Sequence, residues 1–182
     1  MNSRRTFLEH GGLVAASLFA LPSIGFSEGN QEFRGIVSNY DDGEVLRIRD
    51  GTALLRIKIS KLQGSSSMSF LSETFKPGDA LPVHKHLNED ELIFMHRGSG
   101  LLTLGDKQYP IKEGAGALVP KGLWHGLQNT GTEEIDMRFA YTPAGFEGFF
   151  REVGSPIGQP FVRKTMEERR AIAKKWGMIY RD

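Results

Sequence analysis

The sequence predicts an all-β fold, a sandwich or a barrel, followed by a short helical tail. Two observations support this prediction: short runs alternate apolar with polar residues, and turn-forming residues separate the runs about every eight to twelve positions. Residues 45–49 and 55–59 show the alternation clearly, and Asp50-Gly51 between them is a hairpin signal. The opening of the domain therefore reads as two paired antiparallel strands.

Seven further runs have the length and composition of strands. They are residues 68–75, 91–97, 101–104, 109–111, 116–119, 123–128 and 135–141. Gly98-Ser99-Gly100 lies between the second and third of these runs and predicts another hairpin. Because successive side chains on a strand point to opposite faces, every second residue of a run is expected to face the core.

The pattern changes after Pro143, where the chain becomes helical. Residues 145–152 predict a short helix that presents its aromatic side chains to one end of the barrel. Residues 165–176 predict a longer one, since Thr165 and Glu168 have the spacing of a capping box and Gly177 is a stop signal. Its expected docking face consists of Met166, Ile172, Ala173 and Trp176. We therefore expect a barrel of residues 33–145 and a helical extension of residues 146–182 packed on it.

Composition limits the classes of function. The chain has 182 residues, enough for one domain with a real core, and its 39% hydrophobic and 25% charged residues are typical of a globular protein. Its formal charge of +1 gives no sign of the clustered basic surface that nucleic-acid binding requires. The absence of cysteine excludes disulfides and thiolate metal ligands. A small-molecule ligand is the expected partner.

The N-terminus has the features of an export signal. Arg4 and Arg5 precede an apolar stretch at residues 13–21, which is too short to span a bilayer, and small residues follow near residues 25–27. The segment resembles a twin-arginine signal, although Glu9 stands where that signal has lysine. The alternatives are an ordinary secretion signal or an uncleaved amphipathic helix. We expect residues 1–27 to be a signal peptide and the mature protein to be periplasmic, without a membrane span.

Four polar residues have the spacing of a metal site. His84 and His86 are two apart, so on a strand they face the same side, and Glu91 begins the next apolar run. His125 lies on another predicted strand. Three imidazoles and a carboxylate suit one divalent transition metal ion, which could be Fe, Mn, Ni, Co, Cu or Zn.

The two segments that contain these residues resemble the two motifs of the cupin family. Residues 78–98 have the glycine, histidine and glutamate spacing of the first motif, and residues 114–129 have the glycine, proline, histidine and asparagine spacing of the second. The resemblance implies a jelly-roll β-barrel or sandwich with His84, His86, Glu91 and His125 as the metal ligands. It also implies a homodimer, because cupins commonly pair through their sheets.

Within that family, residues 143–150 (PAGFEGFF) look like the tail of small cupins similar to quercetin 2,3-dioxygenase. This resemblance favours an oxygenase that acts on a small enolisable or aromatic substrate. Glu91 is then both a ligand and the catalytic base that takes the substrate's proton. Two alternatives remain open: a cupin that binds a metal or small ligand without turnover, and a sugar isomerase or epimerase that uses the metal as a Lewis acid.

Other residues fit structural roles as well as functional ones. His96 has the opposite parity to Glu91 and is expected to face away from the site. The positions at inward parity are mainly apolar, and Arg97 is the one basic exception on its strand. The ligand is therefore expected to be neutral or aromatic. The paired Arg169 and Arg170 are expected on a solvated helix face. Candidates for either the cavity wall or ordinary packing are Met68, Phe70, Phe75, Phe139 and Tyr141, and candidates for core or dimer contacts are Trp124, Phe146, Phe149 and Phe150.

Overall fold

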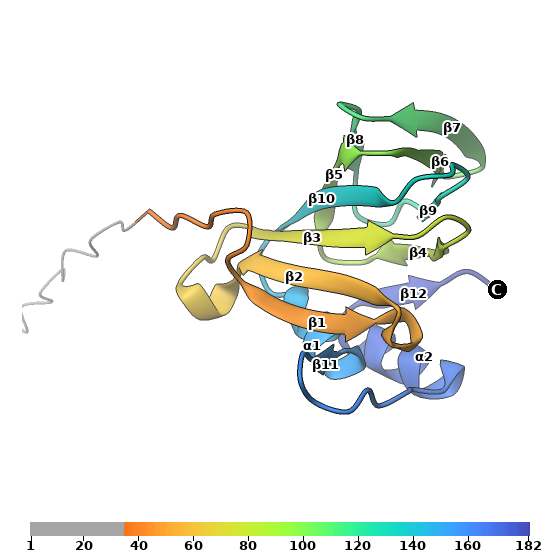
Figure 1. The fold of residues 1–182 in the computed structure, drawn as a ribbon. Helices are drawn as coiled ribbons and strands as arrows, with labels where there is room; N and C mark the ends of the chain where they lie inside the picture. The colour runs from red at the N-terminus through yellow and green to blue at the C-terminus, as the bar shows by residue number, and fades with distance from the viewer. Residues whose placement is uncertain (1–34) are drawn as a thin grey trace, which may run out of the picture. The chain divides into compact units, whose positions relative to one another are not determined.

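A computed structural model describes residues 35–182, which form twelve strands in two antiparallel sheets (Figure 1). The seven-stranded sheet has the order β11-β1-β2-β3-β10-β5-β8, and the five-stranded sheet has the order β12-β4-β9-β6-β7. The bounds are β1 Glu44–Ile48, β2 Ala53–Ile59, β3 Ser69–Phe75, β4 Ala80–His86, β5 Asp90–Arg97, β6 Ser99–Leu104, β7 Lys107–Lys112, β8 Gly116–Val119, β9 His125–Gln128, β10 Ile135–Thr142, β11 Ser155–Pro156 and β12 Met178–Tyr180. The predicted all-β class is confirmed.

The core lies between the two sheets, and the strands that face it alternate as expected. On β3, Leu71, Glu73 and Phe75 are buried, whereas the residues between them are partly exposed. On β5, Glu91, Ile93 and Met95 are buried and the residues between them are exposed. The β1–β2 hairpin around Asp50-Gly51 is also confirmed, through a turn of 3-10 helix at Arg49–Gly51.

The predicted hairpin at Gly98-Ser99-Gly100 is wrong. Strand β5 pairs with β10 and β8 in one sheet, whereas β6 pairs with β7 and β9 in the other. The glycines carry the chain across between the sheets: Gly98 has a φ of +88°, and a Cβ on Gly100 would lie 2.5 Å from the carbonyl oxygen of Gln128. The segment is therefore a crossing between layers.

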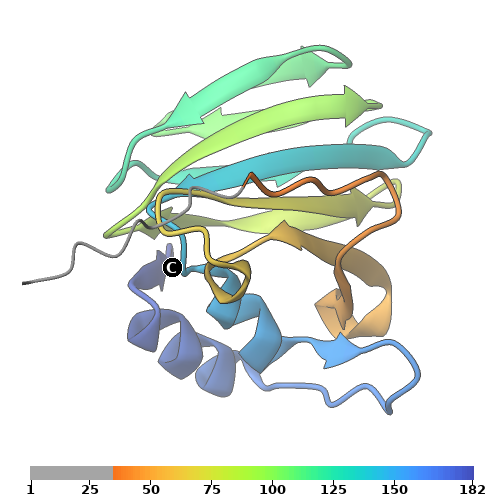
Figure 2. The same ribbon diagram turned by 90° about the vertical axis from the view of Figure 1, so that its left-hand side faces the viewer.

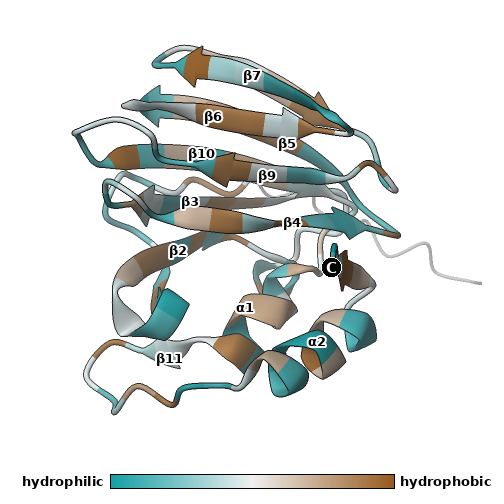
Figure 3. Cartoon of the chain, turned by 90° about the vertical axis from the view of Figure 1, so that its right-hand side faces the viewer, coloured by the Kyte–Doolittle hydropathy of each residue, from teal (hydrophilic) through white to brown (hydrophobic). Residues whose placement is uncertain are grey.

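The C-terminal segment forms the two short helices that the sequence predicts, α1 (Glu147–Val153) and α2 (Met166–Lys175). The capping box is present, since the Thr165 hydroxyl accepts a hydrogen bond from the Glu168 N–H at 3.2 Å and the Glu168 carboxylate accepts one from the Thr165 N–H at 2.7 Å. Of the expected docking face, Ala173 is buried, whereas Met166 is largely exposed. Figure 2 shows both helices along one side of the sheets, and Figure 3 shows hydrophilic residues over much of α2.

The tail also contributes two short strands that the sequence does not predict. Strand β11 pairs with β1 at the edge of the larger sheet, and β12 pairs with β4 at the edge of the smaller one. The second pairing matters for the site, because it places Met178 opposite His86 and Tyr180 opposite His84. The C-terminal segment is thus built into the wall around the predicted metal ligands.

The predicted signal peptide, residues 1–27, and the predicted start of the barrel at residue 33 lie outside the described residues. Within residues 35–182, no helix is long and apolar enough to cross a membrane.

Candidate metal centre

The structure brings the four predicted ligands together in the interior. His84 and His86 lie on β4, His125 lies directly opposite His84 on β9, and Glu91 reaches them from β5 in the other sheet. All four side chains are buried, and one donor atom from each lies within 4.8 Å of the others. Three imidazoles and one carboxylate at this separation form a donor set for a single metal ion.

Backbone carbonyl groups orient two of the histidines. The Nδ1–H of His84 donates a hydrogen bond to the carbonyl oxygen of Pro82 at 2.8 Å, and the Nδ1–H of His125 donates one to the carbonyl oxygen of Leu123 at 3.1 Å. Each carbonyl belongs to the residue two positions earlier, so the strand itself fixes the ring. This arrangement directs the Nε2 atoms of both rings toward the shared centre, as is usual for metal-binding histidines.

Glu91 supplies the negative charge of the cluster. Its Oε2 accepts a hydrogen bond from His125 Nε2 at 2.9 Å and lies 3.5 Å from His86 Nε2. Burial alone would raise the pKa of Glu91, but the hydrogen bond from His125 and the nearby His86 outweigh it and hold that pKa well below its usual range. Burial also holds the pKa of His84 well below its usual value, which leaves a neutral imidazole. Burial lowers the pKa of His125, but the hydrogen bond to Glu91 outweighs it and raises that pKa. His125, which donates from both ring nitrogens here, must therefore lose its Nε2 proton to bind a metal ion, because ionised carboxylates and neutral imidazoles are the metal-binding forms.

His86 is the least satisfied member of the cluster. It is 2% exposed, and neither of its ring nitrogens makes a hydrogen bond with any part of the chain that the structure describes. Its ring packs edge-on against Phe146, with 4.3 Å between the centroids, and lies 5.0 Å from the ring of Tyr141. A buried polar group without a partner is costly. A metal ion at the common centre would give His86 the partner it lacks, so the residues present fit such an ion.

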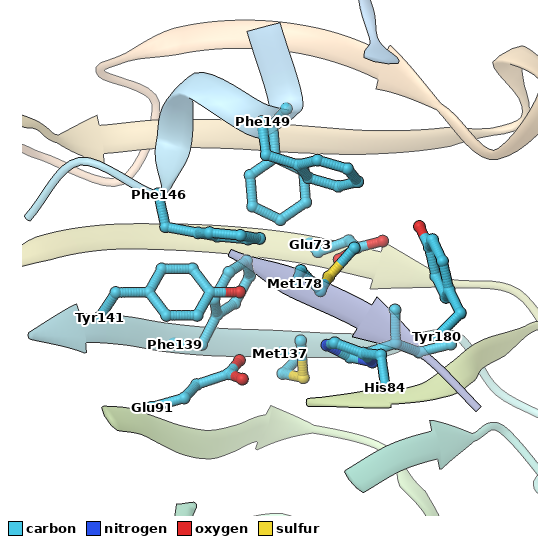
Figure 4. Close-up of a pocket in the computed structure, with 12 residues that line it drawn as sticks. Glu73, His84, Glu91, Met137, Phe139, Tyr141, Phe146, Phe149, Met178 and Tyr180 are labelled. Carbon is cyan, nitrogen blue, oxygen red and sulfur yellow. The ribbon is translucent and has the colours of Figure 1, made fainter. Parts of the chain in front are cut away.

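A cavity of about 40 Å³ opens beside His84 and Glu91 (Figure 4). Its walls are mainly aromatic rings and thioethers, and three polar side chains apart from the cluster, those of Glu73, Tyr141 and Tyr180, also line it. The tail supplies much of the wall, through α1 and β12. The lining residues are Glu73, Leu81, His84, Glu91, Met137, Phe139, Tyr141, Phe146, Phe149, Phe150, Met178 and Tyr180.

Only some of the predicted wall residues face this cavity. Phe139 and Tyr141 line it, whereas Phe75 is part of the hydrophobic core. Met68 precedes β3 and is largely exposed, and Phe70 has the parity opposite to that of the buried Leu71. The two β10 candidates therefore line the cavity, whereas Met68 and Phe70 do not.

The aromatic residues of the tail have a mixed role. Phe146, Phe149 and Phe150 belong to the core, as expected, and they also line the cavity. Trp124 is only half-buried, and its ring lies beneath the cationic groups of Lys85 and Arg181. Of these four aromatic residues, Phe146, Phe149 and Phe150 therefore shape the cavity, and Trp124 does not line it.

The predicted orientations of His96 and Arg97, at the end of β5, have different outcomes. His96 is exposed, as its parity predicts. Arg97 was expected to face inward, but its side chain is 56% exposed and lies 3.8 Å from the Glu134 carboxylate. The expectation is wrong because Arg97 is the last residue of β5, where the chain already turns toward the other sheet.

The sequence did not reveal the importance of Glu73 and Arg49. Glu73 is buried, and its carboxylate accepts a hydrogen bond from the Arg49 guanidinium, which also donates to the Thr74 carbonyl oxygen at 2.8 Å. Burial raises the pKa of Glu73, although the Arg49 charge opposes this effect. The available signal was parity, because Glu73 stands between the inward-facing Leu71 and Phe75. A carboxylate at such a position needs a buried cation.

Comparison with known proteins supports the same fold. Residues 71–141 match the family model described as a cupin domain. The chain is 27% identical to the protein SchB of Streptomyces halstedii over 105 residues, which are 57% of this chain and 75% of SchB. It is 32% identical to the oxalate-binding protein of Thermotoga maritima over 60 residues, which are 33% of this chain and 50% of that protein.

Among solved structures, an RmlC-like cupin from Shewanella frigidimarina resembles the chain with a TM-score of 0.52 at 15% identity, over 61% of this chain and 93% of the other. The two antiparallel sheets, the family match and this likeness agree on one architecture. The described part of the chain therefore has a jelly-roll fold like that of known cupins, and residues 71–141 match the model of the cupin domain.

Proposed function

We propose that the protein is a metal-dependent cupin enzyme, an oxygenase that acts on a small enolisable or aromatic substrate. One observation carries the proposal: a buried cluster of three histidines and a glutamate adjoins a small cavity with mainly aromatic walls. Such a cavity excludes water and favours an apolar or aromatic ligand, while the cluster provides charge at one end.

In this proposal, His84, His86, Glu91 and His125 hold one divalent transition metal ion. When bound, the ion would supply Lewis-acid and redox chemistry next to the cavity. The apolar walls would orient the substrate, and the Tyr141 hydroxyl, which points into the cavity in Figure 4, would donate a hydrogen bond to a substrate oxygen. Burial raises the pKa of Tyr141 well above its usual value, so this hydroxyl keeps its proton. Glu91, the carboxylate nearest the histidines, would take the substrate's proton.

The test is oxygen consumption by purified protein loaded in turn with each candidate metal. We expect uptake on addition of a flavonol or another enediol, and we expect Glu91→Gln to abolish it. His96→Gln is the matched control, because His96 lies on the same strand and faces solvent. Absence of uptake with every metal across the substrate panel would overturn the oxygenase proposal.

A second candidate is a cupin that binds a small ligand without turnover. The size of the cavity supports it: about 40 Å³ leaves room for roughly three water molecules. The relative from Thermotoga maritima is named an oxalate-binding protein, and a ligand as small as oxalate suits such a space better than a flavonol does. Tight retention of a small acid through purification, together with no oxygen uptake, would favour this candidate.

A sugar isomerase is the third candidate, and the walls support it least. Apart from the metal cluster, the cavity offers only Glu73, Tyr141 and Tyr180 as polar side chains, whereas a sugar carries hydroxyl groups on most of its carbons. Interconversion of an aldose and a ketose by the metal-loaded protein would restore this candidate.

Export through residues 1–27 to the periplasm, and a homodimeric state, also remain proposals. Replacing Arg4 and Arg5 by lysine should keep the protein inside the cell in fractionation experiments. Sedimentation of the purified protein as a monomer would contradict the homodimer.

A further inference from the structure

A second cavity, of about 60 Å³, adjoins the first on the side of the tail. The two share five lining residues, Glu73, Leu81, Phe149, Phe150 and Tyr180. The second cavity, which we call the outer chamber, is completed by Ile48, Arg49, Pro82, Val153, Met166 and Arg169. The side chains of these five residues therefore lie between the two spaces.

The outer chamber contains an arginine, Arg169, for which the described part of the chain provides no ion-pair partner. Arg49 is neutralised by Glu73 and Asp79. Arg169, on α2, makes no ion pair and no side-chain hydrogen bond within residues 35–182, although it is partly buried. Its neighbour Arg170 pairs with Asp182 at 3.1 Å and lies outside the chamber. The solvated face that the sequence predicts fits Arg170 but not Arg169.

The surroundings of Tyr180 support this placement of the Arg169 charge. Burial raises the pKa of the Tyr180 hydroxyl, and the charges of Arg169 and Arg170 oppose that rise. The positive charge of Arg169 therefore acts at the partition between the two chambers. The rest of the partition consists of the apolar side chains of Leu81, Phe149 and Phe150 and of the Glu73 carboxylate, which is paired with Arg49.

We propose that the two chambers are the two ends of one ligand site, in which Arg169 binds the carboxylate of a small acid. The apolar or aromatic body of that acid passes Tyr180 and reaches the metal cluster. The inference rests on the proposed function of the cluster as a metal site. It replaces the neutral ligand expected from the sequence with a monocarboxylate that has an apolar or aromatic body. Guanidinium and carboxylate pair through two parallel hydrogen bonds, which makes an unpaired arginine beside an apolar passage a selective anchor.

The dimensions of the site require both chambers. The first cavity, beside the metal cluster, is the inner chamber, and alone it holds about three water molecules. This is too little space for an aromatic ring, so a larger ligand must extend through the partition into the outer chamber. Rotation of the Tyr180 side chain, on the three-residue edge strand β12, would join the two spaces without disturbing the main sheets.

The test compares benzoate with benzamide, which have the same shape but differ in charge. Binding of each is measured by ligand-observed NMR on protein with and without Mn²⁺. We expect the wild type to prefer benzoate, Arg169→Gln to weaken benzoate binding about tenfold without affecting benzamide, and Arg170→Gln, the matched control, to leave both unchanged. Equal binding of the two probes, no benzoate binding, or equal losses in the two variants would overturn the proposal.

Paramagnetic relaxation by Mn²⁺ tests the orientation. We expect the para proton of benzoate to relax fastest, because its ring points toward the cluster and its carboxylate toward Arg169. Fastest relaxation of the ortho protons would place the carboxylate at the metal and overturn the inference. Metal content separates the two proposals: wild-type protein that retains no metal contradicts the proposed function, whereas metal-loaded protein without a dependence on Arg169 contradicts only this inference.

Discussion

Two buried glutamates on the inner face of the larger sheet show how differently the same fold satisfies a carboxylate. Glu73 and Glu91 are each 2% exposed, and both face the same cavity. Glu73 has a permanent partner in the Arg49 guanidinium. Glu91 has no arginine or lysine among its partners and lies beside the histidines of the cluster, one of which, His86, lacks any hydrogen-bond partner in the described chain. The first group is complete as a structural ion pair, whereas the second is complete only with an added cation.

The largest effect on the free energy of unfolding is expected from Arg49→Met, which removes the cation of the Glu73–Arg49 ion pair. It leaves the buried Glu73 carboxylate unpaired and also removes a guanidinium that lies 3.7 Å from the centroid of the Phe75 ring. Loss of one partner of a buried ion pair typically costs about 3–5 kcal/mol. We expect a loss of that size in urea unfolding.

Arg97→Met is the control for this prediction. It breaks an ion pair with Glu134 whose side chains are 56% and 42% exposed, so the expected loss is below about 1 kcal/mol. Similar losses in the two variants would mean that the Glu73–Arg49 pair contributes no more than a surface pair.

His86→Leu should stabilise the metal-free protein, whereas Arg49→Met should destabilise it. It removes a buried imidazole without hydrogen bonds and replaces it with an apolar side chain, so we expect the free energy of unfolding to increase by about 1 kcal/mol. With metal at a hundred times its dissociation constant, the wild type should gain about 2.7 kcal/mol and the variant much less. A variant that is less stable than the wild type under chelating conditions would show that His86 is already satisfied in the metal-free state.

The smallest effect concerns pH. Burial already raises the pKa of Glu73, and Arg49→Met removes the charge that opposes the rise, so the folded-state pKa should increase further. A carboxyl group with a raised folded-state pKa contributes stability below its unfolded pKa and loses it as pH rises through the folded pKa. The cost of Arg49→Met should therefore shrink in acid and grow toward neutral pH. The measurement is the loss in free energy of unfolding caused by Arg49→Met at several pH values. A loss that does not change with pH would contradict this account. So would the same pH dependence when Arg49→Met is made in a Glu73→Gln background.

The difference between the two glutamates also marks what could be predicted from the sequence. Glu91 was identified because it lies close in sequence to His84 and His86, at spacings that a strand and a turn convert directly into a shared centre. Glu73 was missed because its partner Arg49 is 24 residues away and reaches it from the β1–β2 turn. Local periodicity shows which face a residue occupies, but not which distant side chain meets it there.

The same limit explains the errors in topology. Strands β11 and β12 have two and three residues, too few to show any period, so their pairing with β1 and β4 had no local signal. The three residues from Gly98 to Gly100 have the composition of a hairpin turn, and only the close approach of Gly100 to Gln128 shows that they cross between the sheets. The barrel, the capping box and the four clustered residues depend on short-range patterns, and these were predicted correctly.

The most direct test of the central claim, that the incomplete cluster is a metal site, is elemental analysis of the purified wild type beside His125→Ala and Arg49→Met. The account predicts about one divalent transition metal ion per chain in the wild type and in Arg49→Met, and almost none in His125→Ala. Metal content that His125→Ala leaves unchanged would contradict it.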